Sequence, residues 1–274
     1  MVSPSGPASG LVAPEAGLDV NTVIDVGSLH LEVSFTAPPG ATVAILGANG
    51  AGKTTLLRLV AGLWRGASGH VRLGELVLED SAVGRFVAPE RRPVAMVFQD
   101  FLLFPHLSAL DNIAFGLRCR QPELTKAAAR DVAQVWLERV DLAGHGRSKP
   151  GALSAGQAQR VALARALCAV RLGAGVVLLD EPTAQLDVRG ESEIFQRVLE
   201  ATRDCTTILI SHRFSTVRRA DCICVLENGR VVELGTHDEL MALGGRYHTM
   251  FEMQASRFVE LDDKGEEVIY ETLG

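Results

Sequence analysis

Long apolar runs are absent from this sequence of 274 residues. A membrane-spanning helix needs about 18 or more consecutive apolar residues, and no run in the chain reaches that length. We therefore expect any work at a membrane to pass through a partner chain or a docked surface. Lysine and arginine are absent before Lys53, so we also expect no secretory signal peptide.

An excess of positive charge is lacking as well. Lys and Arg number 27 against 33 Asp and Glu, which gives a net charge of -6 and a pI near 5.7. This balance argues against a nucleic-acid binder that works through bulk positive charge. Apolar residues make up 47% and charged residues 22%, a composition that predicts one large folded domain, or one domain with an embedded subdomain.

Paired cysteine motifs are missing. The five cysteines include no C-x-x-C pair and are Cys119, Cys168, Cys205, Cys222 and Cys224. Their odd number in a long chain predicts reduced thiols in a cytosolic protein. Cys222 and Cys224 stand two apart in a strand-like run, so we expect them to share one face of a strand in the core.

What the sequence does contain is an alternation of short apolar runs with helical patterns. Uninterrupted apolar or β-branched runs occur at residues 42–46, 94–98, 176–179 and 207–210. Helical patterns separate them, beginning with residues 53–63. Strands that are apolar on both faces and spaced by helices predict a parallel sheet in an α/β fold.

Two further patterns flank this series. Residues 100–165 are mostly helical, notably 126–140, and predict an inserted helical subdomain. Runs 222–227 and 230–234 flank Asn228-Gly229, a strong signal for a two-residue hairpin. A capping box at residues 236–239 then predicts one helix, whose apolar face would carry Leu240, Leu243, Tyr247, Met250 and Phe251.

The most specific motif is a phosphate-binding loop. Residues 47–54 fit G-x-x-x-x-G-K-[ST], in which glycines let backbone N–H groups point at phosphate oxygens and the next helix presents its positive dipole end. Lys53 is suited to reach the β- and γ-phosphates and Thr54 to bind Mg²⁺. We expect nucleotide contacts from Gly47, Ala48, Asn49, Gly50, Ala51, Gly52, Lys53, Thr54 and Thr55.

Two carboxylates complete the local evidence for a site. The run at 176–179 ends in Asp180 and Glu181, and the carboxyl edge of a parallel sheet delivers such groups to the crevice that holds the phosphate loop. Asp180 suits a Mg²⁺ role, usually through water, and Glu181 is placed to orient or deprotonate an attacking water.

A second glycine-bearing helix start carries a family resemblance. Leu153-Ser154-Ala155-Gly156-Gln157 precedes a helical stretch, where Ser154 suits an N-cap and the helix start an anion site. With the phosphate loop, this segment resembles the signature of the ATP-binding cassette (ABC) transport ATPases. The resemblance covers about residues 20–255 and implies a P-loop NTPase fold: a mainly parallel sheet, an N-terminal antiparallel β region and the helical subdomain.

The resemblance also implies how the site works. Two such domains face each other head to tail, and Ser154, Gly156 and Gln157 of one close on the γ-phosphate of ATP held by the other. Gln99 matches a glutamine that touches Mg²⁺ and the attacking water, His212 a γ-phosphate contact, and Asp187 a residue of the loop 184–187. The implied cofactors are ATP and Mg²⁺, with Thr54, Gln99 and Asp180 toward the metal and Glu181, His212 and Gln99 in catalysis.

The chain departs from the family pattern at several points. Residues 20–30 hold no Phe, Tyr or Trp to stack on adenine, which leaves an apolar contact or His30 for that role. Ala155 stands where glycine is commoner, and Gln185 where the residue is usually small. Residues 168–175 exceed the family's usual spacing and are interpreted as a loop insertion.

The two halves resemble different branches of the family. Residues 89–93 and 103–108 look like molybdate and related anion importers, whereas 211–217, 225–230 and 235–240 look like exporter domains. A natural mosaic and a constructed chimera both remain open. Importers of this kind usually carry a C-terminal regulatory β-domain, and we expect none here.

These observations predict an ATP-hydrolysing subunit that drives separate membrane subunits, with molybdate or a related anion as a candidate import substrate. The alternatives are an exporter-type domain and an ATP-binding switch with little hydrolysis.

Expected partners are a second ABC ATPase subunit and a transmembrane permease, without nucleic acid, at the cytoplasmic face of the membrane. Apolar residues 101–107 and 113–117 offer a groove for a partner helix, or ordinary core. Residues 1–19 and the acidic 256–274 are expected to be tails.

Overall fold

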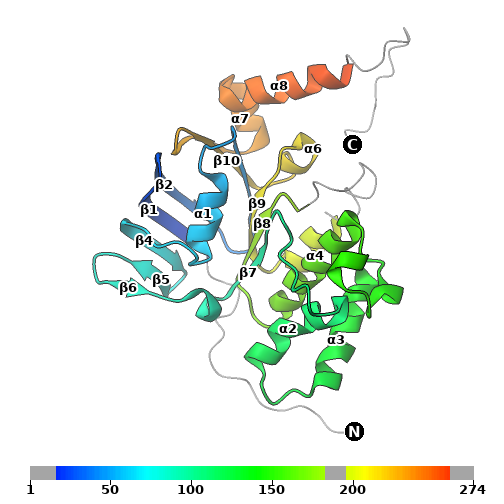
Figure 1. The fold of residues 1–274 in the computed structure, drawn as a ribbon. Coiled ribbons are helices and arrows are strands. Elements are labelled where there is room, and N and C mark those ends of the chain that lie inside the picture. Colours follow the sequence, from blue (N-terminus) through cyan, green and yellow to red (C-terminus); the bar gives the residue numbers. More distant parts are fainter. Residues whose placement is uncertain (1–16, 183–195, 260–274) are drawn as a thin grey trace.

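A computed structural model of the protein describes residues 17–182 and 196–259. These residues form one 11-stranded sheet in the order β6-β5-β4-β1-β2-β11-β10-β3-β9-β8-β7. The strands are β1 (Leu18–Val26), β2 (Leu29–Ala37), β3 (Thr42–Gly47), β4 (Ser68–Leu73), β5 (Leu76–Asp80), β6 (Arg85–Phe86), β7 (Val94–Val97), β8 (Val176–Asp180), β9 (Thr206–Ile210), β10 (Cys222–Glu227) and β11 (Arg230–Gly235). The helical subdomain lies below and to one side of this sheet in Figure 1.

The parallel part of the sheet consists of β10, β3, β9, β8 and β7, which pair in that order. Every residue of β3, β8 and β9 is buried, because these strands are covered on both faces. The predicted parallel α/β core is therefore confirmed, and the carboxyl ends of β3, β8 and β9 reach the same edge of the sheet.

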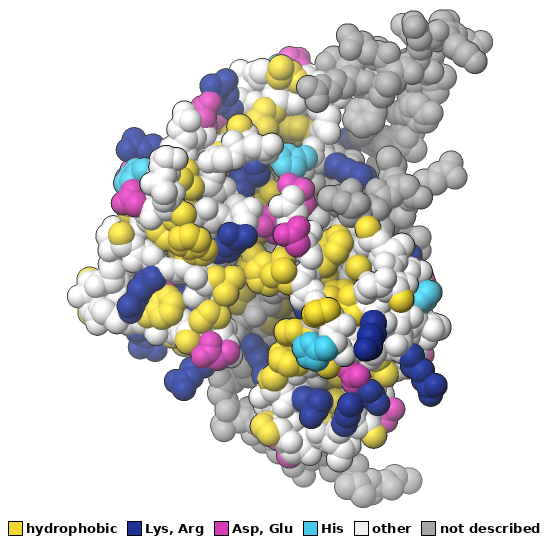
Figure 2. Space-filling view, viewed as in Figure 1, with side chains coloured by type: hydrophobic (Ala, Val, Ile, Leu, Met, Phe, Trp, Pro, Cys, Tyr) yellow, Lys and Arg dark blue, Asp and Glu magenta, His cyan; other side chains and the backbone are white. Residues whose placement is uncertain are grey.

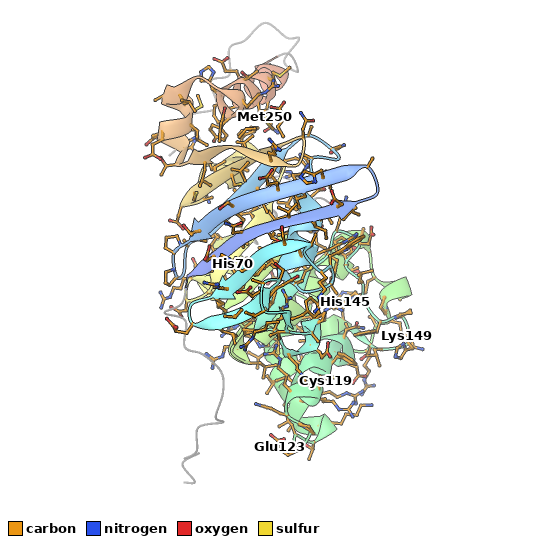
Figure 3. The ribbon with its side chains drawn as sticks, turned by 90° about the vertical axis from the view of Figure 1, so that its left-hand side faces the viewer. His70, Cys119, Glu123, His145, Lys149 and Met250 are labelled. Carbon is orange, nitrogen blue, oxygen red and sulfur yellow. The ribbon has the colours of Figure 1, made fainter. Side chains whose placement is uncertain are left out.

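The antiparallel part contains β1, β2, β4, β5 and β6. Burial alternates along β1, where Leu18, Val20 and Thr22 face the core and their neighbours face outward, as the two-residue period of a strand requires. Figure 3, which turns the molecule by 90°, shows these strands in front, with Met250 near one end of the molecule and Cys119 and Glu123 near the other. The expected N-terminal antiparallel region is confirmed, and its strands are now located.

The helical segments include α1 (Lys53–Val60), α2 (Ala109–Arg120), α3 (Lys126–Arg139), α4 (Ala155–Arg171), α6 (Phe214–Val217), α7 (His237–Leu243), α8 (Arg246–Val259) and the 3-10 turns Pro89–Arg91, Ala143–His145 and Pro150–Ala152. Helices α2, α3 and α4 pack on one another, and α4 also packs on β7. They form the inserted helical subdomain, whose last helix runs beyond residue 165 to Arg171.

The predicted single helix after Thr236 is wrong. The capping box is present, but Gly244 adopts a left-handed φ of 66 and ends α7, as glycine commonly does at a helix C-terminus. Tyr247 lies on the next helix, α8, and is fully buried, whereas Leu243 is 64% exposed. Helix α8 ends at Val259, past residue 255 where the domain was expected to end.

The cysteine expectation holds in part. Cys224 is fully buried and Cys222 is half-buried on β10, and all five cysteines are free thiols. Burial raises the pKa of Cys224 to about 12 and that of Cys168 to about 11. Within the described part of the chain, none of the helices combines the length and the apolar character that crossing a membrane requires.

Candidate active site

The phosphate loop connects the end of β3 to the start of α1. Gly52 is the N-cap of α1 at a φ of 104, a conformation that only glycine adopts without strain. A Cβ atom on Gly52 would lie 2.7 Å from Leu31 Cδ1, and one on Gly47 would collide with the carbonyl oxygen of Leu226. The backbone is therefore held in the cradle shape that the sequence predicts, and both glycines are required for it.

Lys53 crosses this loop with its side chain. Its Nζ donates hydrogen bonds to the carbonyl oxygens of Gly47 at 2.7 Å and Ala48 at 3.0 Å. Burial lowers the pKa of Lys53, while the negative charges of Glu181 and Asp180 oppose that shift. The ammonium group is thus held by carbonyl oxygens of the loop itself.

Asp180 and Thr54 meet at the end of β8. Thr54 Oγ1 donates to Asp180 Oδ1 at 3.5 Å, a long hydrogen bond. Asp180 is 3% exposed, and its pKa is raised, mainly by burial and further by the charge of Glu181. A hydroxyl and a carboxylate are the hard oxygen donors that Mg²⁺ prefers. No group of three or more His, Cys, Asp or Glu is suited to a metal within residues 17–182 and 196–259.

Glu181 and His212 face each other across the same edge. Glu181 Oε1 lies 3.0 Å from His212 Nε2, with the histidine side chain 48% and the glutamate side chain 23% exposed. Glu181 has a left-handed φ of 49, and its N–H donates to the carbonyl of Ile210 at 3.1 Å. Such a conformation costs about 1–3 kcal/mol and persists only where surrounding contacts enforce it.

Gln99 lies in the turn after β7. Residues Val97 and Leu179 are paired in the parallel sheet, so Gln99 reaches the same edge as Asp180 and is exposed there. Among the described residues its side chain makes no hydrogen bond to the phosphate loop or the carboxylates. The next residues, Phe101 and Leu102, also have left-handed φ values of 60 and 40.

The signature segment forms the N-terminus of α4. Ser154 Oγ accepts a hydrogen bond from Gln157 N–H at 3.2 Å, and Gln157 Oε1 accepts one from Ser154 N–H at 2.9 Å. Ser154 is exposed and Gly156 is half-buried. In the described chain no hydrogen bond joins this helix start to the phosphate loop.

Two side chains near the site have roles that sequence reasoning missed. Buried Gln159 on α4 donates from Nε2 to the carbonyl of Pro182, directly after Glu181, and its Oε1 has no partner among the described atoms. Arg165 donates to the carbonyls of Phe101 at 2.8 Å and Leu102 at 2.9 Å. Both residues stand in the helical stretch after the signature, but only the fold shows what they touch.

The sequence also predicts site residues near the adenine and in the loop 184–187. His30 Nδ1 lies 2.7 Å from Asp25 Oδ1 on the β1–β2 hairpin. Leu29, beside it, comes within 3.5 Å of a Cβ atom built on Gly52, so an apolar side chain borders the phosphate loop. Asp187 and the rest of the loop 184–187 lie outside the described residues.

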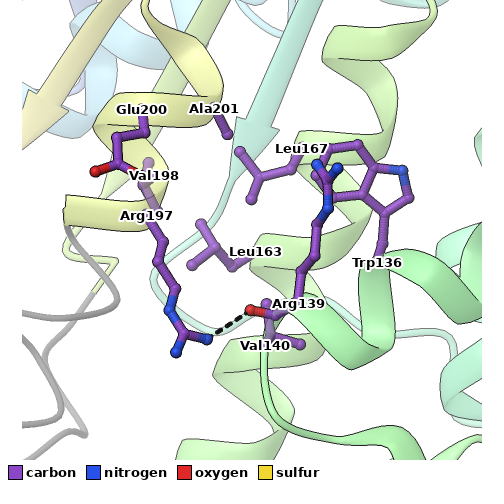
Figure 4. A pocket seen from close by; sticks show the side chains of 9 residues that line it. All are labelled: Trp136, Arg139, Val140, Leu163, Leu167, Arg197, Val198, Glu200 and Ala201. Carbon is purple, nitrogen blue, oxygen red and sulfur yellow. Dashed lines mark hydrogen bonds between the residues drawn. The ribbon is translucent and has the colours of Figure 1, made fainter.

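A cavity of about 420 Å³ lies away from this edge. Figure 4 shows it between α3, α4 and the helical residues that begin at 196, with Trp136 and Arg139 on one wall. None of the predicted site residues lines it. This cavity is therefore separate from the residues that meet at the carboxyl edge of the sheet.

Comparison with known proteins extends these observations. Residues 31–184 match the family model described as ABC transporter. The chain is 43% identical over 215 residues to a molybdenum import ATP-binding protein, ModC, of Mycobacterium tuberculosis, covering 77% of this chain and 58% of that protein. It is 37% identical over 227 residues to an ATP-dependent lipid A-core flippase of Xanthomonas campestris pv. campestris, covering 81% and 37%.

A solved structure has the same fold. It is a dimeric post-hydrolysis state of an ATP-binding cassette bound to ADP and phosphate, with a TM-score of 0.69 and 26% identity, covering 80% of this chain and 98% of that one. The chain spans less than two thirds of the length of the two relatives above. An importer ATPase and a flippase both appear among its relatives, and each matches more than three quarters of this chain.

Proposed function

Because this chain belongs to the ABC transporter family and has the fold of its ATPase domain, we propose that it hydrolyses ATP in a head-to-tail dimer and drives solute transport by separate membrane subunits. The observation that carries this proposal is the convergence of Lys53, Asp180, Glu181 and His212 at one edge of the sheet. A cation, a metal-binding carboxylate and a base held by an imidazole are what phosphoryl transfer to water requires.

ATP and Mg²⁺ fit the residues at this edge. The phosphates would lie in the loop Gly47–Thr55, with Lys53 neutralising their charge and the N-terminus of α1 facing them. Thr54 and Asp180 would hold Mg²⁺, directly or through water, with Gln99 as the further ligand. Bound Mg²⁺ would supply charge neutralisation at the phosphate oxygens. Leu29 is the apolar side chain we assign to the adenine, because it borders the loop in place of an aromatic.

Glu181 is the proposed base. Its carboxylate would accept a proton from the attacking water as the new bond from water oxygen to the γ-phosphorus forms, while the bond between the γ-phosphorus and the bridging oxygen breaks and ADP leaves with that oxygen. His212 Nε2, 3.0 Å away, would hold that carboxylate in place and contact the γ-phosphate. The strained backbone at Glu181 supports this role, because such strain is concentrated at functional sites.

A second copy would complete each site. Ser154, Gly156 and Gln157 lie at a helix start that suits an anion, and the same chain makes no hydrogen bond from them to its own phosphate loop among the described residues. We propose that this surface closes on the γ-phosphate held by the partner copy. The dimeric ATP-binding cassette with the same fold supports this arrangement.

The membrane partner would dock between the sheet and the helical subdomain. Figure 2 shows hydrophobic side chains gathered in a hollow between these two parts. Leu63, Leu102 and Phe115 are 48%, 54% and 43% exposed, whereas Ile113, Ala114 and Leu117 are buried core. The proposed location is therefore the cytoplasmic face of the membrane, held there by a permease subunit.

The proposed substrate is molybdate or a related anion. The importer relative named for molybdenum supports import, and the flippase relative supports the alternative of an exporter-type domain. A binding switch with little hydrolysis is opposed by the contact of 3.0 Å between Glu181 and His212, which a pure switch does not need.

The test is phosphate release by the purified chain and by its Glu181→Gln variant. Loss of a general base lowers a rate by about 10²–10⁴-fold, so we expect kcat to fall within that range while ATP binding is kept and a dimer accumulates. Glu75→Gln, a carboxylate-to-amide change at an exposed turn, is the matched control and should keep the parental rate. Equal rates for Glu181→Gln and the parent would overturn the assignment of the base.

A further inference from the structure

The segment that carries His212 is held from outside by a residue of the C-terminal helix. Gln254, on α8, donates from Nε2 to the carbonyl oxygen of His212 at 3.1 Å. Its Oε1 accepts a hydrogen bond from the N–H of Phe214 at 3.2 Å. One amide group therefore binds the backbone on both sides of Arg213.

These two backbone groups lack partners in their own elements. Strand β9 ends at Ile210, so the carbonyl of His212 is outside the sheet ladder. Phe214 is the first residue of α6, whose N-cap provides no side-chain hydrogen bond, and the first N–H groups of a helix have no acceptor within that helix. An amide that both donates and accepts satisfies the pair, whereas a carboxylate or an alkyl group does not.

Aromatic contacts fix the helix that presents Gln254. The Phe214 ring meets Phe251 edge-on at 5.2 Å and lies 5.5 Å from the Tyr247 ring. Tyr247 is fully buried, and its hydroxyl lies 2.7 Å from His237 Nδ1 on α7. Helix α8 is thus packed on α6 and α7 by rings one turn or two before Gln254, which limits where its amide can lie.

We propose that Gln254 is a positioning residue for His212: through the two backbone hydrogen bonds it keeps the His212 imidazole at Glu181. The inference rests on the proposed function, because it assigns the C-terminal helix a part in the same hydrolytic site. Gln254 itself touches no reacting atom. Its effect on turnover passes through His212, which lies 3.0 Å from Glu181.

The experiment is a double-mutant cycle on the full chain. Gln254→Leu keeps the approximate volume and removes both hydrogen bonds; we expect kcat for ATP to fall about tenfold, the rate equivalent of two such bonds, with KM changed by less than about threefold. Gln254→Glu keeps only the acceptor for Phe214 N–H and should fall between the parent and Gln254→Leu. In a His212→Ala background, Gln254→Leu should cause no further loss.

Glu252→Gln is the control, since this exposed residue lies on the same helix and pairs with His248 instead; it should keep the parental kcat. A second readout does not depend on turnover: the ¹⁵N resonances of the His212 ring in the nucleotide-free chain should move in Gln254→Leu toward those of a freely exposed imidazole. Unchanged His212 resonances, an unchanged kcat, or an equal further loss in the His212→Ala background would overturn the positioning role. If the proposed function itself is wrong, the result is different: the parent chain shows no ATPase activity.

Discussion

The carboxyl edge of the parallel sheet and the N-terminus of α4 are the two proposed anion sites, and they are built in opposite ways. At the sheet edge, β3, β8 and β9 bring Lys53, Asp180 and Glu181 together inside one chain, and Lys53 and Asp180 are almost fully buried. At α4, Ser154 is exposed and hydrogen-bonds within its own helix. Burial raises the cost of every unpaired group at the first site, whereas the second is stable in water and free to meet another chain.

The largest effect on stability is expected at Arg92, at the end of α1 that lies away from the phosphate loop. Arg92 is fully buried and donates to the carbonyls of Leu59 and Val60 at the end of α1, and it pairs with Glu79 at 3.3 Å. Arg92→Met leaves the Glu79 carboxylate buried without its charge partner, which costs about 3–5 kcal/mol. Urea unfolding should show this loss, and Arg92→Met with Glu79→Leu should recover part of it. A double variant no more stable than Arg92→Met would contradict the pairing.

The signature helix should respond in function more than in stability. Ser154→Ala removes the N-cap of α4 and should lower the free energy of unfolding by about 1 kcal/mol. Binding of a nucleotide analogue to the isolated chain should stay at the parental affinity, because Ser154 makes no hydrogen bond to the described phosphate loop, while ATP turnover falls. Thr125→Ala, at the N-cap of α3, is the control with the same type of cap and no phosphate role. If a monomeric Ser154→Ala chain binds the nucleotide more weakly than the parent, Ser154 and the phosphate loop of the same chain act in one site, which contradicts this prediction.

A smaller effect, of opposite sign, is expected at Asp180. Its pKa is raised in the folded chain, mainly by burial, so the native state binds a proton more tightly and stability falls as pH rises through the pKa of the unfolded carboxyl toward the folded one. Asp180→Asn should therefore raise the Tm of the chain without Mg²⁺ or nucleotide at neutral pH, by roughly 2–4 °C for each kcal/mol recovered. The difference should vanish below the unfolded pKa, near pH 4. An equal gain in Tm at neutral pH and below about pH 4 would show that burial of the Asp180 charge does not cause the gain.

Residues with a local motif at the end of a strand were the predictable part of the site. The phosphate loop, Asp180 and Glu181 each follow a buried strand, so the sequence predicts both their chemistry and their common edge. The hairpin at Asn228-Gly229 is also local, and it forms as predicted, with β10 and β11 on either side.

Contacts between distant segments were not predictable. Gln254 and His212 are 42 residues apart in the chain, and no spacing rule relates them. Gln159 likewise reaches Pro182, 23 residues away, only because the fold brings α4 close to the residues that follow β8. The break at Gly244 was missed for a different reason: helical periodicity continues through it, and the left-handed turn that ends α7 is decided by one residue.

The phosphate loop of one chain is proposed to form one site with the signature segment of another, and mixing two inactive chains tests this. Lys53→Met removes the phosphate contact but keeps the signature, and Ser154→Asp places a negative charge at the signature but keeps the cradle. Alone, each variant should release little phosphate.

An equal mixture should regain roughly a quarter of the parental rate, because half of the dimers are mixed and each mixed dimer has one intact site of two. A mixture no more active than the two variants measured separately would contradict a shared site, as would a Ser154→Asp chain with the parental rate.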